Sequence, residues 1–341
     1  LGFVLGPRVL NVISVATLGY LETVVSVALA VLGVFVGMAF APHLRAAPRL
    51  IAAASLEALI TIAIVAGAIT FVVTRSQMPL GAPIALAALC LGIAASASSA
   101  STADPYDDPA ARAASKVADL DDVLPILMSG TVLLVSGSLG PGAQALAIGA
   151  APIIGLAIGL AGWLLFERAE SAAERGALLL GAIALLGGAP VYLSASPLVA
   201  GFIAGLFWTL APGRSNAIVA DDLRKIQHPL VVLLLVSAGA MCVPSIAAAW
   251  LIGPYVLFRI CGKLAGAWVA ARFSGIGATV TPFDLGVYLI PPGVIGIAFA
   301  LGFSQLLPNA LGALIVTTVA AGSILCELAA FYVLPAGRRE G

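Results

Sequence analysis

Charge is scarce in this sequence, because lysine, arginine, aspartate and glutamate together make up 9% of its 341 residues. A soluble globular chain carries about 25% charged residues, so this chain has too little charge to cover a water-facing surface. The 16 basic and 16 acidic residues cancel, which leaves no basic excess for contacts with phosphates. Nucleic-acid binding is therefore excluded as a main function, and so is intrinsic disorder.

Paired cysteines and nucleotide-binding motifs are also missing. The four cysteines are scattered through apolar runs without a Cys-x-x-Cys pair, which argues against a disulfide scaffold. The sequence contains no Walker motif, no dinucleotide-binding fingerprint and no His/Cys spacing of a metal site. Neither an enzyme nor an ATP-driven pump is supported, and we expect no cofactor.

Hydrophobic residues reach 61% of the chain. Because a bilayer core needs about 20 apolar residues per helix, we predict an all-α polytopic membrane protein with about 11–12 transmembrane helices. Residues 1–18 resemble the end of an earlier span. Because the sequence begins with Leu1 rather than Met, we also expect a missing N-terminal helix segment before it. The predicted spans are 20–41, 50–74, 80–101, 114–137, 143–166, 176–193, 196–212, 228–243, 246–272, 284–303 and 308–335.

The basic residues test this division, because loops rich in Lys and Arg face the cytoplasm. When the predicted loops are assigned to alternate sides, one side takes only Arg8 and Arg75. The other side takes Arg45, Arg49, Arg112, Lys116, Arg168, Arg175, Arg214, Arg224, Lys225, Arg272, Arg338 and Arg339. We therefore expect a multi-pass protein of the inner (plasma) membrane, surrounded by the lipid bilayer, with a cytoplasmic C-terminus.

Three acids lie on the predicted span 114–137, and ionisable groups at membrane depth usually mark a functional site. Asp119 and Asp122 are i,i+3 neighbours that share a helix face, and Asp121 directly precedes Asp122. Adjacent carboxylates cannot both ionise cheaply in a low dielectric, so this pair predicts a group that exchanges a proton for a cation. Pro125 has no N–H for the carbonyl of Asp121, and the freed oxygen is a ligand that suits an alkali cation.

Basic side chains lie within the predicted span 246–272, where Arg259 and Lys263 are one helical turn apart. We interpret Lys263 as a counter-charge that pairs with one aspartate and is released when a cation or proton replaces it. The alternative is that these charges only tie helices together. For Arg259 we favour this alternative, with a side chain that snorkels to the lipid or the extracellular side. For Glu57, inside span 50–74, we favour snorkelling or a structural hydrogen bond.

Two predicted spans are interrupted. The run 94–102 is rich in small and hydroxyl residues and includes Ser98, Ser99 and Thr102, and Pro291 and Pro292 break helical hydrogen bonding in span 284–303. Paired interruptions are typical of a transporter's central site, whereas close helix packing and a simple kink are the alternatives. Each interrupted span is the middle one of three, in 50–137 and in 246–335, and these two groups of three cross the membrane in opposite directions. We therefore predict inverted repeats whose two broken helices cross at the midplane.

In this order, the residues resemble the membrane domain of the monovalent cation:proton antiporter superfamily, the bacterial sodium/proton exchangers and their potassium-efflux relatives. The resemblance covers nearly the whole chain. It rests on the segments Leu5-Gly6-Pro7, 95–102, Asp121-Asp122-Val-Leu, 192–205, Gly262-Lys263-Leu-Ala-Gly266 and 289–293.

The resemblance implies secondary active antiport of Na⁺ or K⁺ against H⁺ by alternating access. It implies that Asp122 binds the cation and the proton alternately, and that Asp121 pairs with Lys263 in the unloaded state. It further implies one domain, 1–341, with a mobile core (50–137 and 246–335) beside a dimerisation scaffold (1–41 and 143–243), working as a homodimer by an elevator-like movement. The secondary site would contain Ser98, Ser99, Thr102, Asp119, Pro291 and Pro292.

Some positions depart from the family's pattern. Pro292 stands where the family usually has a charged residue, and the segment between Ser99 and Asp121 is shorter than usual. These departures favour an alternative function, a non-transporting antiporter-like scaffold or sensor subunit within a larger membrane complex. A third reading is a symporter for an organic anion on a related fold, which dependence on an anion in place of a cation would reveal.

Overall fold

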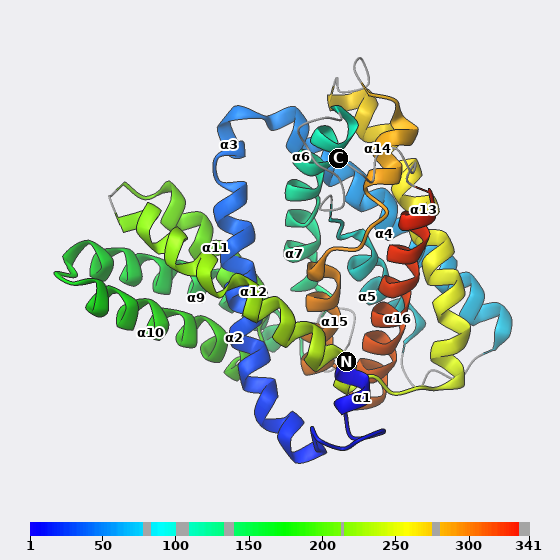
Figure 1. Cartoon of the computed structure of the whole chain (residues 1–341), viewed down its shortest axis with the longest axis horizontal. Helices are drawn as coiled ribbons and strands as arrows, with labels where there is room; N and C mark the ends of the chain where they lie inside the picture. Colours follow the sequence, from blue (N-terminus) through cyan, green and yellow to red (C-terminus); the bar gives the residue numbers. More distant parts are fainter. Residues whose placement is uncertain (78–82, 100–108, 133–139, 213–214, 275–279, 334–341) are drawn as a thin grey trace. The chain divides into compact units, whose positions relative to one another are not determined.

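The computed structural model describes residues 1–77, 83–99, 109–132, 140–212, 215–274 and 280–333, and these are almost entirely α-helical (Figure 1). Within them, 7 helices are long and apolar enough to cross a membrane. Three shorter apolar helices accompany them: Ile84–Ser96, Pro197–Leu210 and Val294–Leu306. The predicted all-α membrane fold is confirmed. The predicted span 114–137 is divided in the structure and runs into residues 133–139, which lie outside the described part.

The chain separates into two compact units. The first unit comprises Leu1–Pro42 and Ser129–Met241. Serine side chains begin three of its helices: Ser14, Ser171 and Ser196 each accept a hydrogen bond from a backbone N–H of the first helical turn. Its helices are α1 (Gly2–Leu5), α2 (Val15–Phe40), α9 (Pro141–Arg168), α10 (Ala172–Tyr192), α11 (Pro197–Leu210) and α12 (Ser215–Met241).

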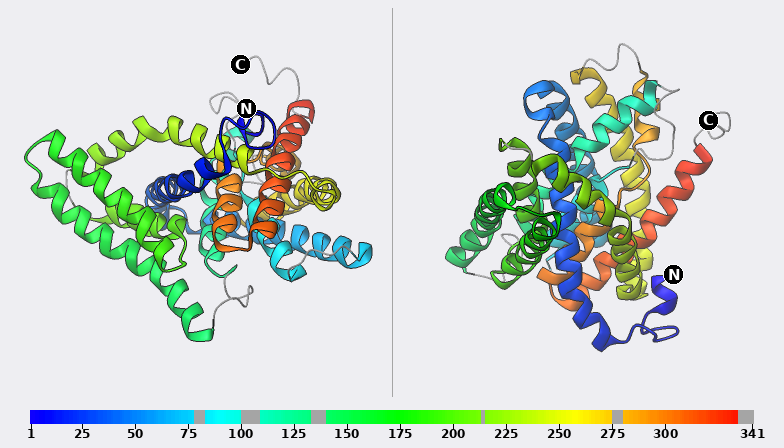
Figure 2. Two further views of the ribbon diagram at one scale, coloured as in Figure 1. Left: turned by 90° about the horizontal axis from the view of Figure 1, so that it is seen from below. Right: turned by 60° about the vertical axis from the view of Figure 1, so that its left-hand side comes forward.

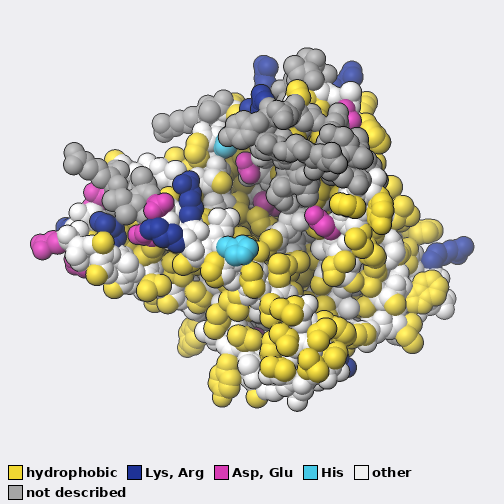
Figure 3. All heavy atoms as spheres, in the orientation of Figure 1, with side chains coloured by type: hydrophobic (Ala, Val, Ile, Leu, Met, Phe, Trp, Pro, Cys, Tyr) yellow, Lys and Arg dark blue, Asp and Glu magenta, His cyan; other side chains and the backbone are white. Residues whose placement is uncertain are grey.

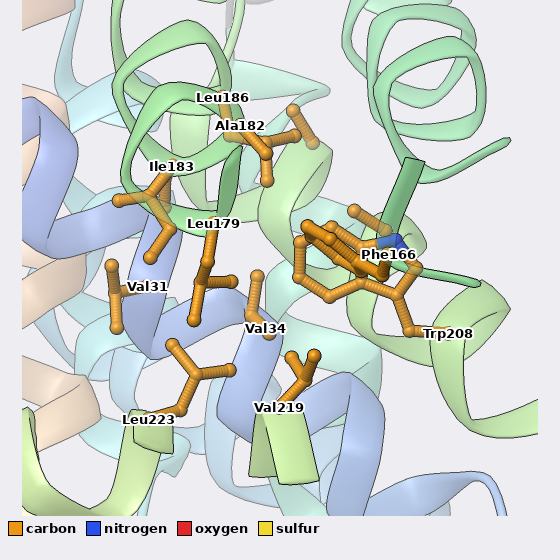
Figure 4. Packing of buried hydrophobic residues seen from close by; sticks show 13 residues of the cluster. Val31, Val34, Phe166, Leu179, Ala182, Ile183, Leu186, Trp208, Val219 and Leu223 are labelled. Atoms are coloured by element: carbon orange, nitrogen blue, oxygen red, sulfur yellow. The ribbon is translucent and has the colours of Figure 1, made fainter. Parts of the chain in front are cut away.

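The apolar core of the first unit lies among α2, α9, α10, α11 and α12 (Figure 4). Trp208 is the largest side chain of this core and is 1% exposed. Its ring packs edge-on against Phe166 at 5.3 Å between centroids, and its indole N–H donates to the carbonyl of Gly159 at 2.8 Å. The polar group of a buried tryptophan thus keeps a partner while its ring fills the core.

The helix α12 begins earlier than the sequence indicated. The predicted span begins at residue 228, but α12 already begins at Ser215. Lys225 lies 3.2 Å from Asp221 and 2.8 Å from Asp222, at i,i+4 and i,i+3 spacing. Such pairs stabilise the exposed start of a helix, so charge density alone was a poor sign of a loop.

Helices α2 and α11 approach each other so closely that their contact requires glycine. A Cβ built at Gly201 on α11 would overlap the carbonyl group of Ala30 on α2. Small residues allow this kind of close backbone approach between membrane helices. The contact therefore depends on Gly201 having no side chain.

We expect Gly201→Ala to destabilise the protein by about 1–3 kcal/mol, because the added methyl group forces the two backbones apart. Gly188→Ala on α10 is the matched control, since a Cβ there meets nothing within 4 Å and alanine favours the helix. Thermal unfolding in detergent should show a lower melting temperature for Gly201→Ala alone. Equal melting temperatures for the two variants would contradict the close-packing argument.

The second unit comprises His43–Met128 and Cys242–Gly341. Both predicted interruptions are present in it: α5 gives way to extended backbone after Ser96, and the segment between α14 and α15 is not helical. The assignment of mobile-core and dimerisation roles, and the inverted repeat, stay predictions. The helices of this part of the chain are α3 (His43–Ala46), α4 (Pro48–Ser76), α5 (Ile84–Ser96), α6 (Pro109–Asp121), α7 (Val123–Ser129), α13 (Ile246–Ser274), α14 (Pro282–Tyr288), α15 (Val294–Leu306) and α16 (Asn309–Val333).

The surface is strongly apolar. Hydrophobic side chains cover much of the face shown in Figure 3, and charged side chains are few there. In the first unit, the neighbouring helices α9 and α10 (Figure 2) expose Leu146, Ile153 and Leu180. Large apolar side chains exposed on long apolar helices fit contact with lipid tails.

Candidate functional site

Charged side chains are buried at one place in the second unit. Among the described residues, the buried charged side chains are Glu57, Asp121, Asp122, Arg259 and Lys263, and we call these five the buried charge cluster. Charges buried in protein need partners of opposite sign or hydrogen bonds, because desolvation disfavours them otherwise. The contacts of each member therefore show how the cluster is held.

The close approach of α4 and α13 brings Glu57 to Lys263. A Cβ at Gly266, one turn after Lys263, would lie 2.9 Å from the carbonyl oxygen of Glu57, so only glycine fits there. The Glu57 carboxylate lies 3.1 Å from the Lys263 ammonium. It also accepts a hydrogen bond of 3.0 Å from the hydroxyl of Thr61, one turn along α4. Glu57 is thus held by its own helix and by α13.

Lys263 is bound on several sides. Its ammonium lies 3.0 Å from Asp121 Oδ2 and 3.1 Å from the hydroxyl oxygen of Ser98, and it donates to the carbonyl of Ser96 at the end of α5. The Ser98 hydroxyl in turn donates to the same Asp121 oxygen. Lys263 therefore bridges two carboxylates, those of Glu57 and Asp121, and the broken end of α5.

The acid pair lies at a helix break. Helix α6 ends at Asp121 and α7 begins at Val123, which leaves Asp122 in the turn between them. Pro125 explains the position of this break, because it has no N–H to donate to the carbonyl of Asp121. Asp122 is 5% exposed, and its Oδ1 makes no hydrogen bond to any residue in the described part of the chain. The same is true of Asp121 Oδ1.

Arg259 joins the two interrupted segments. Its guanidinium donates to the carbonyls of Ala95 and Ala97 near the end of α5, the second at 2.7 Å. It also reaches the carbonyls of Ile290 and Pro291 beyond α14, at 3.4 and 3.5 Å. The last carbonyls of a helix have no partner within the helix and carry partial negative charge. A guanidinium with five donors satisfies several of them at once.

The two interrupted segments contact each other directly. Ser98 and Pro292 form an isolated antiparallel bridge, and the N–H of Ser99 donates to the carbonyl of Pro291 at 3.0 Å. Four of the six predicted secondary-site residues therefore meet beside the buried charge cluster. Two extended stretches in contact, with a basic side chain on their carbonyls and acids beside them, form a polar centre inside apolar helices.

Among solved structures, an antiporter has a similar arrangement of helices. The chain superimposes on the sodium proton antiporter MjNhaP1 from Methanocaldococcus jannaschii with a TM-score of 0.67 and 16% sequence identity, over 97% of this chain and 90% of that one. The fold is that of a sodium/proton antiporter. No protein-family model matches the sequence, and no curated protein matches it in sequence.

Within the antiporter fold, some sequence predictions need correction. Arg259 was expected to reach lipid or the extracellular side, but it is 1% exposed and binds backbone carbonyls. Asp119 was expected to share a face with Asp122, but it is exposed, whereas Asp122 is 5% exposed. Thr102 lies outside the described residues.

The ion pair of Glu57 with Lys263 was not predicted from the sequence. The predicted structural hydrogen bond is present, from Thr61, but Glu57 does not snorkel: it is fully buried and forms an ion pair with Lys263. A signal was present, because Glu57 and Thr61 are spaced i,i+4 on α4, and Gly262 and Gly266 flank Lys263 on α13. Small residues beside a buried lysine indicate that another helix approaches closely.

Proposed function

We propose that this protein exchanges a monovalent cation, Na⁺ or K⁺, for protons across the membrane by alternating access. The observation that carries the proposal is the acid pair itself. Asp121 and Asp122 are buried at a helix break, beside the contact between two broken helices, and each has a carboxylate oxygen without a hydrogen bond to a described residue. Carboxylate oxygens are the hard ligands that alkali cations prefer.

The contacts favour a division of roles within the acid pair. Asp122 makes no ion pair with a described residue, so its carboxylate is the group that takes the proton and the cation in turn. Asp121 is held by Lys263 and Ser98 until a cation competes for its oxygens. The backbone carbonyls beside the helix break would supply further oxygen ligands.

The setting of this exchange is part of the proposal. We infer a homodimer in the inner (plasma) membrane with a cytoplasmic C-terminus, in which the second unit is the moving core and the first is the scaffold. The predicted basic loops support the orientation. No resident cofactor is required, because the gradients of the two transported ions drive the exchange.

The competing function is a scaffold or sensor that no longer transports. The absence of a charged residue at position 292 favoured that alternative. However, Arg259 places a guanidinium on the carbonyls of Ile290 and Pro291, so a positive charge is present at this break even though Pro292 is uncharged. The retained charge supports transport over the scaffold alternative.

Cation-driven proton movement in proteoliposomes tests the proposal. The purified protein is reconstituted in vesicles with an interior pH dye, and Na⁺, K⁺ or choline is added outside under an imposed pH gradient. We expect proton movement with Na⁺ or K⁺ and none with choline or in protein-free vesicles. Folded protein that gives no cation-dependent signal would contradict antiport and favour the scaffold function. Dependence on an organic anion would indicate the symporter.

A further inference from the structure

The buried charge cluster contains more acidic than basic side chains. Counted over the described residues, it holds three carboxylates, those of Glu57, Asp121 and Asp122, and two cationic side chains, Arg259 and Lys263. Among the other described acids of the second unit, Asp119 and Glu327 are exposed and do not enter this count. With every member ionised, the cluster carries one negative charge in excess. One monovalent positive charge, a cation or a proton, makes it neutral.

Glu57 also keeps the Lys263 ammonium paired when a cation binds to Asp121. With a single acidic partner, the ammonium would lose its counter-charge as soon as the cation occupied Asp121. An unpaired buried ammonium is costly and favours release of its proton. Here the Glu57 carboxylate remains 3.1 Å from the ammonium, and the carbonyl of Ser96 also accepts from it. Lys263 therefore keeps a charged partner throughout.

We propose that Glu57 is a positioning residue that holds the Lys263 ammonium while Asp121 releases it, so that one monovalent cation is exchanged for one proton without net charge movement. This inference rests on the proposed function and adds its charge stoichiometry. In the proton-loaded state three negative and two positive side chains hold one proton. In the cation-loaded state the same side chains hold one Na⁺ or K⁺. Both states are neutral, so burial in the membrane favours each of them over any charged state.

The wild-type protein gives the first test. Proteoliposomes carry an interior pH dye and a membrane-potential dye, and Na⁺ or K⁺ is added in separate experiments. We expect proton movement over many turnovers with no membrane potential generated by the exchange, and an unchanged rate when the potential is clamped. A potential that builds up with the proton movement would overturn the inference and leave the proposed antiport standing. Absence of any cation-driven proton movement would overturn both.

Three variants test the role of Glu57 through the concentration of cation at half-maximal rate. Glu57→Gln removes the negative excess, so we expect the half-saturating concentration to rise at least about tenfold. Lys263→Gln removes a positive charge and raises the negative excess to two, so the half-saturating concentration should fall. Removing both charges restores an excess of one carboxylate, so the double variant should lie within about threefold of wild type.

Glu170→Gln, an exposed acid outside the cluster, is the matched control and should leave the half-saturating concentration unchanged. Size-exclusion profiles in detergent confirm that each variant is folded. If a single variant does not fold, recovery of folding in the double variant is expected on the same charge argument. If the half-saturating concentration of the double variant lay as far from wild type as that of the more affected single variant, the role of Glu57 would be overturned. A merely structural contact would not produce opposite shifts that cancel.

Discussion

Asp122→Asn is expected to reduce cation-driven proton movement to the level of protein-free vesicles while the protein remains folded. Asparagine has nearly the same shape as aspartate, but it neither takes up and releases a proton nor offers a charged oxygen to a cation. The substitution breaks no ion pair with a described residue, and Asp122 Oδ1 has no hydrogen bond within the described part of the chain. The melting temperature should therefore stay near that of wild type.

The matched control is Asp119→Asn, the same change three residues earlier on the exposed face of α6. It should retain most of the exchange activity, because the side chain does not belong to the buried charge cluster. Comparable losses in both variants would show that Asp119 and Asp122 both act through the electrostatics of the whole region. Full activity of Asp122→Asn would remove the acid pair from the mechanism.

Much of the fold could be predicted from the sequence, because membrane helices are constrained by length and hydrophobicity alone. The predicted span 246–272 corresponds to α13, Ile246–Ser274, and 308–335 corresponds to α16, Asn309–Val333. The break at Pro291 was also predictable, since proline removes a backbone donor. The start of α12 was not predictable in this way, because i,i+3 and i,i+4 ion pairs turn a charged stretch into helix.

The partners of the charged side chains were only partly predictable. The position of Lys263 on an apolar span indicated a counter-charge, and the structure places it 3.0 Å from Asp121. The contact with Glu57 depends on which helices pack together, and a single sequence contains little information on packing between helices far apart in the chain. For Arg259 the prediction was wrong for another reason: its partners are backbone carbonyls, which every residue possesses and no sequence motif marks.

Removing Arg259 should have the largest effect on stability. Its guanidinium donates to carbonyls on both interrupted segments, at Ala97 and Ile290 among others. Alanine at this position leaves buried acceptors without donors and opens a cavity where a fully buried side chain had been. We expect Arg259→Ala to lower the free energy of unfolding by about 3–5 kcal/mol. Lysine should restore part of this loss, because its ammonium keeps the charge but lacks the planar fork that spans two segments.

Thermal unfolding of the detergent-solubilised protein measures this effect, with Arg272→Ala as the matched control. Arg272 lies on the same helix, α13, but is exposed, so its removal should change the melting temperature little. The expected order of stability is wild type and Arg272→Ala, then Arg259→Lys, then Arg259→Ala. If Arg259→Ala melted like Arg272→Ala, the guanidinium would not hold the two breaks together. The broken ends of α5 and α14 would then have to be stabilised by their mutual backbone contact, from Ser99 to Pro291, alone.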